Sequence, residues 1–486
     1  MIKLQQIVYN KWFLPLFFCL AISISVFQHY RVFSLDVIGY HAWRQTQTQT
    51  VIENFANEDF NILNPRINDF YYKDRLFRME FPLAQWIIAA LYKLLGNHLI
   101  ITRLFFYLAT LFSVWGIYKV IQALTRNKLV ACLTSWFFLF SPIIYYYSVN
   151  PLPDNLALCL GIWSVYYWIK HLKEDKMKFF VISILFLAFS LAVKLPFIVF
   201  GIMYVSKVYE RGREKKIDVK YILLPALICS LPLLWYVFII STWRENGIIG
   251  GIFSSDFPLL KLLDIFQFNL ISTLPELLVN YATVPLFIIG LYFVFRSFNF
   301  RDTVHRSLFY VLCACSFYFL YEMNMIDKVH DYYLFVFLPF IFIIISKAIL
   351  IILSKPANGL KYLILLSFMV SPITAYLRCN TRWNAYSPGF TKEYLFYKKD
   401  LQAIIPKDAK VIVHGDASRC IVLYHLNRKG WSDSEEGLTK DKVDNAIKNG
   451  ATYLVSDTGT DISKFIDMNS VYLIFQKNAL KLYKIK

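Results

Sequence analysis

The chain has 486 residues, of which 57% are apolar and 17% charged, and a soluble protein of this size carries more charge. The formal net charge of +18 is explained by lysines and arginines in loops that face anionic lipid, because no basic, aromatic platform for nucleic acid lies outside the apolar runs. Continuous apolar runs of about 15 to 22 residues recur along the chain, which predicts a polytopic helical membrane protein and disfavours a β-barrel.

The first apolar run, Trp12 to Phe27, indicates a membrane anchor because no small-residue cleavage site follows it. A polar outer loop, residues 31–99, comes next and contains the stretch DVIGYHAWRQTQTQT (36–50) and the short apolar segment 81–96. The hydropathy of the whole chain predicts about eleven membrane spans, at residues 12–30, 100–121, 129–148, 155–170, 179–193, 195–209, 221–241, 276–295, 307–322, 332–350 and 360–378.

The distribution of lysine and arginine decides two ambiguous segments. If 81–96 lies in the membrane interface and 179–209 is a helical pair broken at Lys194-Leu195-Pro196, the basic loops all share one side with the N-terminus. That arrangement predicts a cytoplasmic N-terminus and an external C-terminus. The basic loops are 122–128, 169–178, 207–220, 296–306 and 347–361.

The tail has the pattern of a soluble domain. The apolar runs KVIVH (410–414), ATYLV (451–455) and VYLIF (471–475) alternate with helical patterns at 417–426 and in DKVDNAIKNG, which predicts a small α/β domain. HGDAS, after the first strand, is too weak a glycine pattern to indicate a nucleotide site. We therefore expect a membrane domain at 1–385, which includes the outer loop 31–99, and an extracytoplasmic α/β domain at 386–486. No spacing rule supports a disulfide between Cys379 and Cys420.

Ionisable residues avoid the centres of nearly all spans and gather where the spans meet the predicted outer face. A charge close to the bilayer is costly, so such residues usually have a function. Charges at mid-depth would indicate an ion-coupled transporter, whereas charges along one water-facing edge indicate a reaction or recognition site. The residues at this edge are Asp36, His41, Arg44, Glu80, Asp154, Lys194, His330 and Asp331.

In the order and topology of these residues, the chain resembles the C-type integral-membrane glycosyltransferases over roughly residues 1–380. The resemblance is to the branch that contains protein O-mannosyltransferases and the aminoarabinose transferase of lipid A. The sequence differs from the family at two places. Where the family has a basic residue before two prolines and a leucine, this chain has Glu80-Phe81-Pro82-Leu83. Where a second acid is common in the family, Val37 follows Asp36. The resemblance rests on Asp36 with HAWRQ (41–45), Pro153-Asp154, Lys194-Leu195-Pro196 and His330-Asp331-Tyr332-Tyr333.

The resemblance implies that a sugar is transferred, with inversion, from a polyprenyl phosphate to a hydroxyl acceptor at the outer face of a bacterial-type plasma membrane. An acceptor hydroxyl needs a base, for which we predict Asp36, with Asp154 as a second catalytic residue. The lipid phosphate that leaves needs only cations. No cofactor is implied with certainty, and a divalent metal is left open. The predicted substrate-binding residues are His41, Trp43, Arg44, Glu80, Lys194, His330 and Tyr332.

Each of these residues also has an ordinary structural explanation. Trp43 suits an interfacial aromatic belt, and Arg44 can extend to lipid headgroups. Acids such as Glu80 and Asp154 are common at helix starts.

Two other functions stay open on the sequence: a flippase or transporter of lipid-linked sugars, and a polysaccharide polymerase or ligase. The charge-poor span interiors, the absence of an inverted repeat and the soluble tail disfavour a transporter. The sequence leaves open which sugar is moved, whether the acceptor is a lipid, a glycan or a protein, and the oligomeric state.

Overall fold

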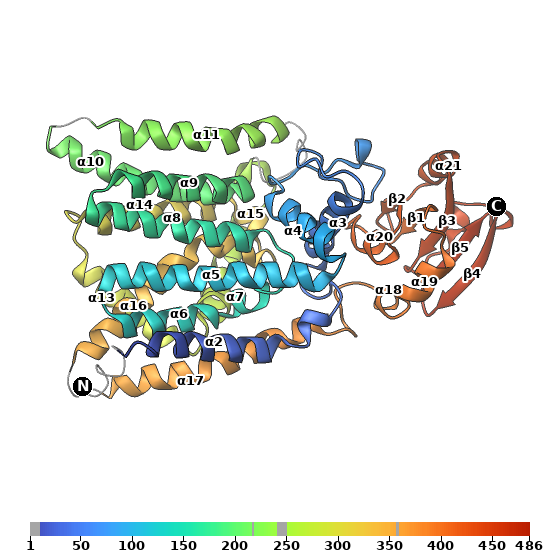
Figure 1. Ribbon diagram of the computed structural model, residues 1–486. Coiled ribbons are helices and arrows are strands. Elements are labelled where there is room, and N and C mark those ends of the chain that lie inside the picture. Colours follow the sequence, from blue (N-terminus) through green and yellow to red (C-terminus); the bar gives the residue numbers. More distant parts are fainter. Residues whose placement is uncertain (1–9, 216–217, 241–249, 356–358) are drawn as a thin grey trace.

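The computed structural model describes residues 10–215, 218–240, 250–355 and 359–486. It has two parts, a bundle of long helices and a small sheet domain formed by the end of the chain, and helices α3 and α4 lie between them (Figure 1). This is the predicted fold class, a helical membrane protein that carries a small α/β domain. In the described part of the chain, six helices have the length and composition needed to cross a membrane.

Helical segments lie over the predicted spans. The outer loop contains η1 (Val32–Ser34), α3 (Ala42–Asn57), η2 (Lys73–Arg75) and α4 (Leu83–Leu95). The bundle contains α2 (Phe13–His29), α5 (Leu99–Thr125), α6 (Lys128–Leu139), α7 (Pro142–Tyr147), α8 (Asp154–Glu174), α9 (Met177–Val193), η3 (Leu195–Tyr204), α10 (Val205–Arg213), α11 (Lys220–Ile240), η4 (Gly251–Ser254), α12 (Leu259–Phe268), η5 (Asn269–Val279), α13 (Val284–Ser297), α14 (Thr303–Tyr321), α15 (Met323–Ile326), η6 (Asp331–Phe337), α16 (Leu338–Ser354), α17 (Leu360–Cys379) and η7 (Asn380–Trp383).

The segment before α13 differs from the prediction. Residues 242–275 were expected to form an outer loop, but α12 and the π-helix η5 occupy 259–279. The helical pattern is masked in the sequence by the polar residues and by Pro275, which the π-helical turns accommodate. A break at Asn280, whose φ is +79°, then separates η5 from α13. Residues 241–249 lie outside the described residues; they include the last residue of the predicted span 221–241 and the first part of the predicted loop 242–275. Residues 1–9, 216–217 and 356–358, in the predicted cytoplasmic segments, also lie outside the described residues.

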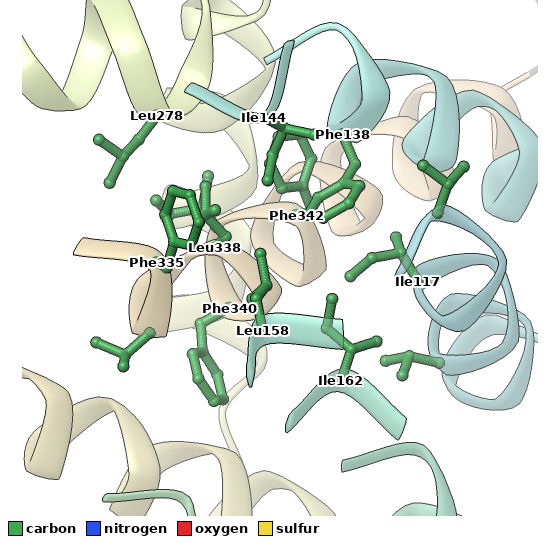
Figure 2. Close-up of a cluster of buried hydrophobic side chains, with 14 of the residues drawn as sticks. Ile117, Phe138, Ile144, Leu158, Ile162, Leu278, Phe335, Leu338, Phe340 and Phe342 are labelled. Atoms are coloured by element: carbon green, nitrogen blue, oxygen red, sulfur yellow. The ribbon is translucent and has the colours of Figure 1, made fainter. Parts of the chain in front are cut away.

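Aromatic and branched aliphatic side chains fill the centre of the bundle. Figure 2 shows Phe138 of α6, Leu158 and Ile162 of α8, and Phe340 and Phe342 of α16 among this buried cluster. Lipid is as apolar as these side chains, so close packing rather than water exclusion holds the helices together.

Small residues permit the closest helix contacts in the bundle. A Cβ atom on Gly290 of α13 would lie 2.1 Å from the carbonyl oxygen of Ile344 on α16. This backbone contact therefore requires glycine.

The C-terminal domain contains a five-stranded sheet in the order β2-β1-β3-β5-β4. Strands β2, β1 and β3 are parallel, and β5 pairs antiparallel with both β3 and β4. The three predicted strands are present. The elements are α18 (Glu393–Phe396), α19 (Lys398–Ile404), β1 (Lys410–His414), α20 (Ile421–Leu426), β2 (Lys429–Asp433), α21 (Lys440–Lys448), β3 (Ala451–Ser456), η8 (Ile462–Lys464), η9 (Met468–Ser470), β4 (Val471–Lys477) and β5 (Leu480–Ile485).

The outer loop is hydrogen-bonded to the edge of this sheet. The backbone N–H of Phe70 donates to the carbonyl of Gly430 at 2.8 Å, and the N–H of Gly430 donates to the carbonyl of Asn68 at 3.0 Å. The loop thus covers the free edge of β2, and the carboxyl ends of the parallel strands are held close to the end of the helical bundle.

Candidate functional site

Helix α3, formed by the polar stretch 42–57, is buried between the two domains. It begins at His41, whose φ of +59° places it in the left-handed region. Gly39 precedes it, and a Cβ atom there would lie 1.9 Å from the carbonyl oxygen of Arg382. The glutamines and threonines of this helix are almost fully buried. Gln49 donates to the hydroxyl of Tyr92 on α4 at 2.8 Å, and this bond between two buried groups helps to fix the position of the helix.

Arg44 and Glu80 form a buried ion pair. The Nη2 atom of Arg44 donates to both carboxylate oxygens of Glu80, at 2.5 and 2.6 Å, and Gln85 donates to the same carboxylate at 3.2 Å. Burial acts to raise the pKa of Glu80, but the charges of Arg44 and Lys194 bring it below its usual value. The two residues that the sequence predicts as separate substrate ligands therefore neutralise each other.

Lys194 and Asp154 form a second ion pair nearby. The Nζ atom of Lys194 lies 3.2 Å from Oδ1 of Asp154, and 5.6 and 5.4 Å from the ring centres of Tyr332 and Tyr333. Oδ2 of Asp154 is buried without a hydrogen-bond partner among the described residues. Asp154 is the first residue of α8 and Lys194 directly precedes η3, so two helix ends bring this pair together.

Lys194 lines a pocket of about 200 Å³ together with Glu80, Glu322 and Tyr333. Glu322, just beyond the end of α14, was not predicted from the sequence. Burial raises the pKa of its carboxyl group to about 7, and Oε2 has no hydrogen-bond partner in the described part of the chain. The sequence signal was an acid directly after an aromatic span. The pocket therefore contains one cation, the carboxylate of Glu80 and the weakly acidic carboxyl group of Glu322.

His330 lies against His41 and Trp43. Its ring stacks on that of His41 with the centres 5.6 Å apart, and the ring of Trp43 is nearly perpendicular to it, with the centres 6.1 Å apart. Nδ1 of His330 donates to the carbonyl of Met325 at 2.6 Å, which leaves Nε2 as an acceptor in the neutral ring. Burial lowers the pKa of His330, so the ring is neutral at pH 7.

Asp331 anchors this histidine pair. Its carboxylate accepts from the hydroxyl of Tyr147 at 2.5 Å and from Arg382 at 3.3 Å, and Nε2 of His41 lies 3.8 Å away. The same nitrogen of His41 donates to the carbonyl of Val329 at 3.0 Å. His41 is therefore fixed in position behind His330.

A cavity of about 950 Å³ separates these residues from the C-terminal domain. Trp43, His330 and Tyr332 line it on the side of the bundle, and the loop 415–422 lines it on the side of the sheet. Tyr333 and Met79 line both this cavity and the Lys194 pocket, so the two spaces adjoin.

Asp36 lies apart from this group. Its carboxylate accepts from Nζ of Lys398 at 2.5 Å and from the hydroxyl of Tyr424 at 3.0 Å, both in the C-terminal domain. Burial acts to raise the pKa of Asp36, but the charges of Lys398 and His425 and the hydrogen bonds from Lys398 and the backbone N–H of Val37 together bring it to about 2. Asp36 does not line the large cavity. In this conformation it is an ionised contact between the domains.

Two further expectations concern metals and cysteines. Among the residues that the structure describes, no group of three or more His, Cys, Asp or Glu side chains is arranged to hold a metal ion. Cys379 and Cys420 are buried free thiols.

The whole fold is similar to that of known membrane enzymes. ArnT from Cupriavidus metallidurans in the apo state matches with a TM-score of 0.69 and 12% identity, over 97% of both chains. ArnT from the same organism bound to undecaprenyl phosphate matches with a TM-score of 0.67 and 12% identity, over 98% of both chains. The archaeal oligosaccharyltransferase AglB from Archaeoglobus fulgidus, in complex with an inhibitory peptide and a dolichol-phosphate, gives a TM-score of 0.56 and 10% identity, over 92% of this chain and 69% of that one.

These matches establish the C-type fold of the integral-membrane glycosyltransferases, which confirms the resemblance seen in the sequence. Residues 80–240 independently match the family described as dolichyl-phosphate-mannose-protein mannosyltransferase. Among curated proteins, none matches the sequence. The chain therefore has the C-type fold of a multi-pass membrane protein, and its residues 80–240 match a family of glycosyltransferases.

Proposed function

We propose that this glycosyltransferase moves a sugar from a polyprenyl-phosphate donor to a hydroxyl acceptor at the outer face of a bacterial-type plasma membrane. The observation that carries the proposal is the contact between two unlike spaces, the Lys194 pocket and the large cavity, which share Tyr333 and Met79. One suits a lipid phosphate and the other a water-borne acceptor. In this arrangement the C-terminal domain lies outside the cell.

The Lys194 pocket suits the donor. Its remaining walls include Ile198 and Val199 of η3, and Ile198 is 44% exposed on the surface of the bundle, where a lipid tail can lie. Lys194 supplies the positive charge for the phosphate. As the bond between the anomeric carbon and the phosphate oxygen breaks, charge builds on that oxygen, and a cation there contributes a few kcal/mol, roughly. Asp154 is the positioning partner that holds Lys194.

The acceptor then enters the large cavity and attacks the anomeric carbon from the face opposite to the phosphate, so the configuration inverts. Its hydroxyl proton passes to a base, the new carbon–oxygen bond forms, and the lipid phosphate leaves with the bonding electrons. The sequence predicts Asp36 as this base. The geometry favours His330, because its ring is neutral, faces the cavity and keeps Nε2 available.

For Asp36 to act as the base, Lys398 and Tyr424 must first release it, which requires the C-terminal domain to move. His330 needs no such movement. The two assignments therefore differ in what they require of the domain.

The test uses purified full-length protein in lipid nanodiscs, with a panel of polyprenyl-phosphate sugars that differ in the sugar. We expect one donor to be consumed, with free polyprenyl phosphate as a product, and Lys194→Met to abolish consumption. Lys328→Met is the matched control, because Lys328 forms a surface ion pair with Asp264. If every donor stays intact and the wild type does not bind undecaprenyl phosphate, the proposal is wrong.

The same assay separates the alternatives. A flippase would leave the donor intact while moving it between leaflets. A polymerase or ligase would transfer a whole glycan block, which mass spectrometry of the product distinguishes from a single sugar.

A further inference from the structure

The wall of the large cavity formed by the C-terminal domain contains a phenol group without a partner. Tyr394 of α18 is 0% exposed as a residue and lines the cavity. Its hydroxyl has no hydrogen-bond partner among the described residues. A buried hydroxyl without a partner carries a desolvation cost, which a bound ligand would remove.

Asp457 lies in the same wall, directly after β3. A Cβ atom on Gly415, whose φ is +116°, would lie 2.2 Å from Oδ1 of Asp457. The carboxylate is therefore packed on the bare backbone at the carboxyl end of β1, and its position depends on glycine there. Burial raises the pKa of Asp457.

Asp416, the other acid of this wall, is already occupied. Its Oδ1 accepts from the backbone N–H of Ser418 and its Oδ2 from that of Val422, both at 2.9 Å. Asp416 therefore shapes the loop before α20. Arg419 of the same wall lies 3.8 Å from Asp433, and the Asp457 carboxylate is hydrogen-bonded to the side chain of Thr391. The groups that can still bond a ligand in this wall include the phenol of Tyr394 and the rest of the Asp457 carboxylate.

We propose that Tyr394 and Asp457 form a binding subsite for the hydroxyl groups of an uncharged sugar, so that the acceptor is a glycan. Neighbouring hydroxyls of a sugar can donate to the carboxylate and accept from the phenol at once. A phosphorylated or carboxylated acceptor would be repelled by Asp457. The inference rests on the proposed function and deepens it, because the subsite places the acceptor in the cavity that His330 lines from the other side.

The test measures saturation-transfer NMR of methyl β-glucoside with the full-length protein in nanodiscs. We expect binding to weaken about tenfold in Tyr394→Phe and in Asp457→Asn, each of which removes one hydrogen-bonding role. Tyr472→Phe and Asp444→Asn are matched controls, because both residues are exposed in the same domain away from the cavity. Glucose 6-phosphate should not compete.

The inference is overturned if the wild type does not bind methyl β-glucoside, if both variants bind it as the wild type does, or if glucose 6-phosphate binds better. Binding of undecaprenyl phosphate is measured on the same samples. If the wild type and the variants bind undecaprenyl phosphate but the methyl β-glucoside result fails, only the sugar subsite is wrong. If the wild type does not bind undecaprenyl phosphate, the result counts against the proposed function itself.

Discussion

Replacing Glu80 by glutamine would leave the guanidinium of Arg44 buried without its counter-charge. The two side chains are 3% and 6% exposed and are joined by hydrogen bonds of 2.5 and 2.6 Å. Removing one partner of such a pair costs about 3–5 kcal/mol, because the other charge stays desolvated. Gln47 and Met79 still contact Arg44. We therefore expect Glu80→Gln to lower the free energy of unfolding by about 3 kcal/mol, at the lower end of that range.

The assay is equilibrium unfolding in detergent micelles, followed by tryptophan fluorescence. Glu58→Gln is the matched control, because Glu58 pairs with Arg75 and Lys429 at the protein surface and should cost less than about 1 kcal/mol. The double variant Arg44→Met with Glu80→Leu should recover most of the loss, because no charge then remains buried. A Glu80→Gln protein as stable as the Glu58→Gln control, or a double variant no more stable than Glu80→Gln alone, would refute the reasoning.

Three further predictions concern the proposed reaction. His330→Gln should slow transfer by about 10²–10⁴-fold, and an unchanged rate in this variant would rule His330 out as the base. Because burial lowers the pKa of the His330 ring, the wild-type rate should fall with decreasing pH only below 6.5. If Asp36 is the base, Asp36→Asn should abolish transfer with folding intact, and near-normal turnover would remove it from the mechanism. The folded pKa of Asp36, about 2, lies below its usual 3.8, so its ion pair with Lys398 stabilises domain docking above about pH 4 and is lost as the pH falls toward 2. Limited proteolysis across that pH range checks this, and a cleavage pattern that does not change would contradict it.

The spans and three of the five strands follow from local pattern. Hydropathy and the sidedness of basic loops predict the bundle, and strong apolar runs predict β1, β3 and β4. Strand β2 was missed because its sequence, KGWSD, holds a glycine that the neighbouring strand requires: a Cβ atom on Gly430 would lie 1.8 Å from the carbonyl oxygen of Val411. The helix at 259–279 was missed because its π-helical turns and Pro275 hide the ordinary period.

The sequence predicts only part of the candidate site, because local pattern does not show which distant residues pair. The cost of charge near a bilayer identifies which residues gather at one end of the bundle, but it does not identify their partners. Arg44 pairs with a residue 36 positions away, and Asp36 with one 362 positions away. Tyr394 belongs to no motif, and only its burial without a partner distinguishes it. Pairing across such separations depends on the assembled fold.

The hydrogen bonds between Phe70 in the outer loop and Gly430 in β2 join an early part of the chain to a late one. During synthesis the outer loop emerges from the ribosome long before the sheet does, so it must wait for its partner strand. A nascent chain arrested within the bundle would carry the donor pocket but lack the far wall of the large cavity. Under the proposed function, transfer would therefore begin only once the C-terminal domain has folded onto the outer loop, and unfinished copies of the chain would leave a lipid-linked sugar intact.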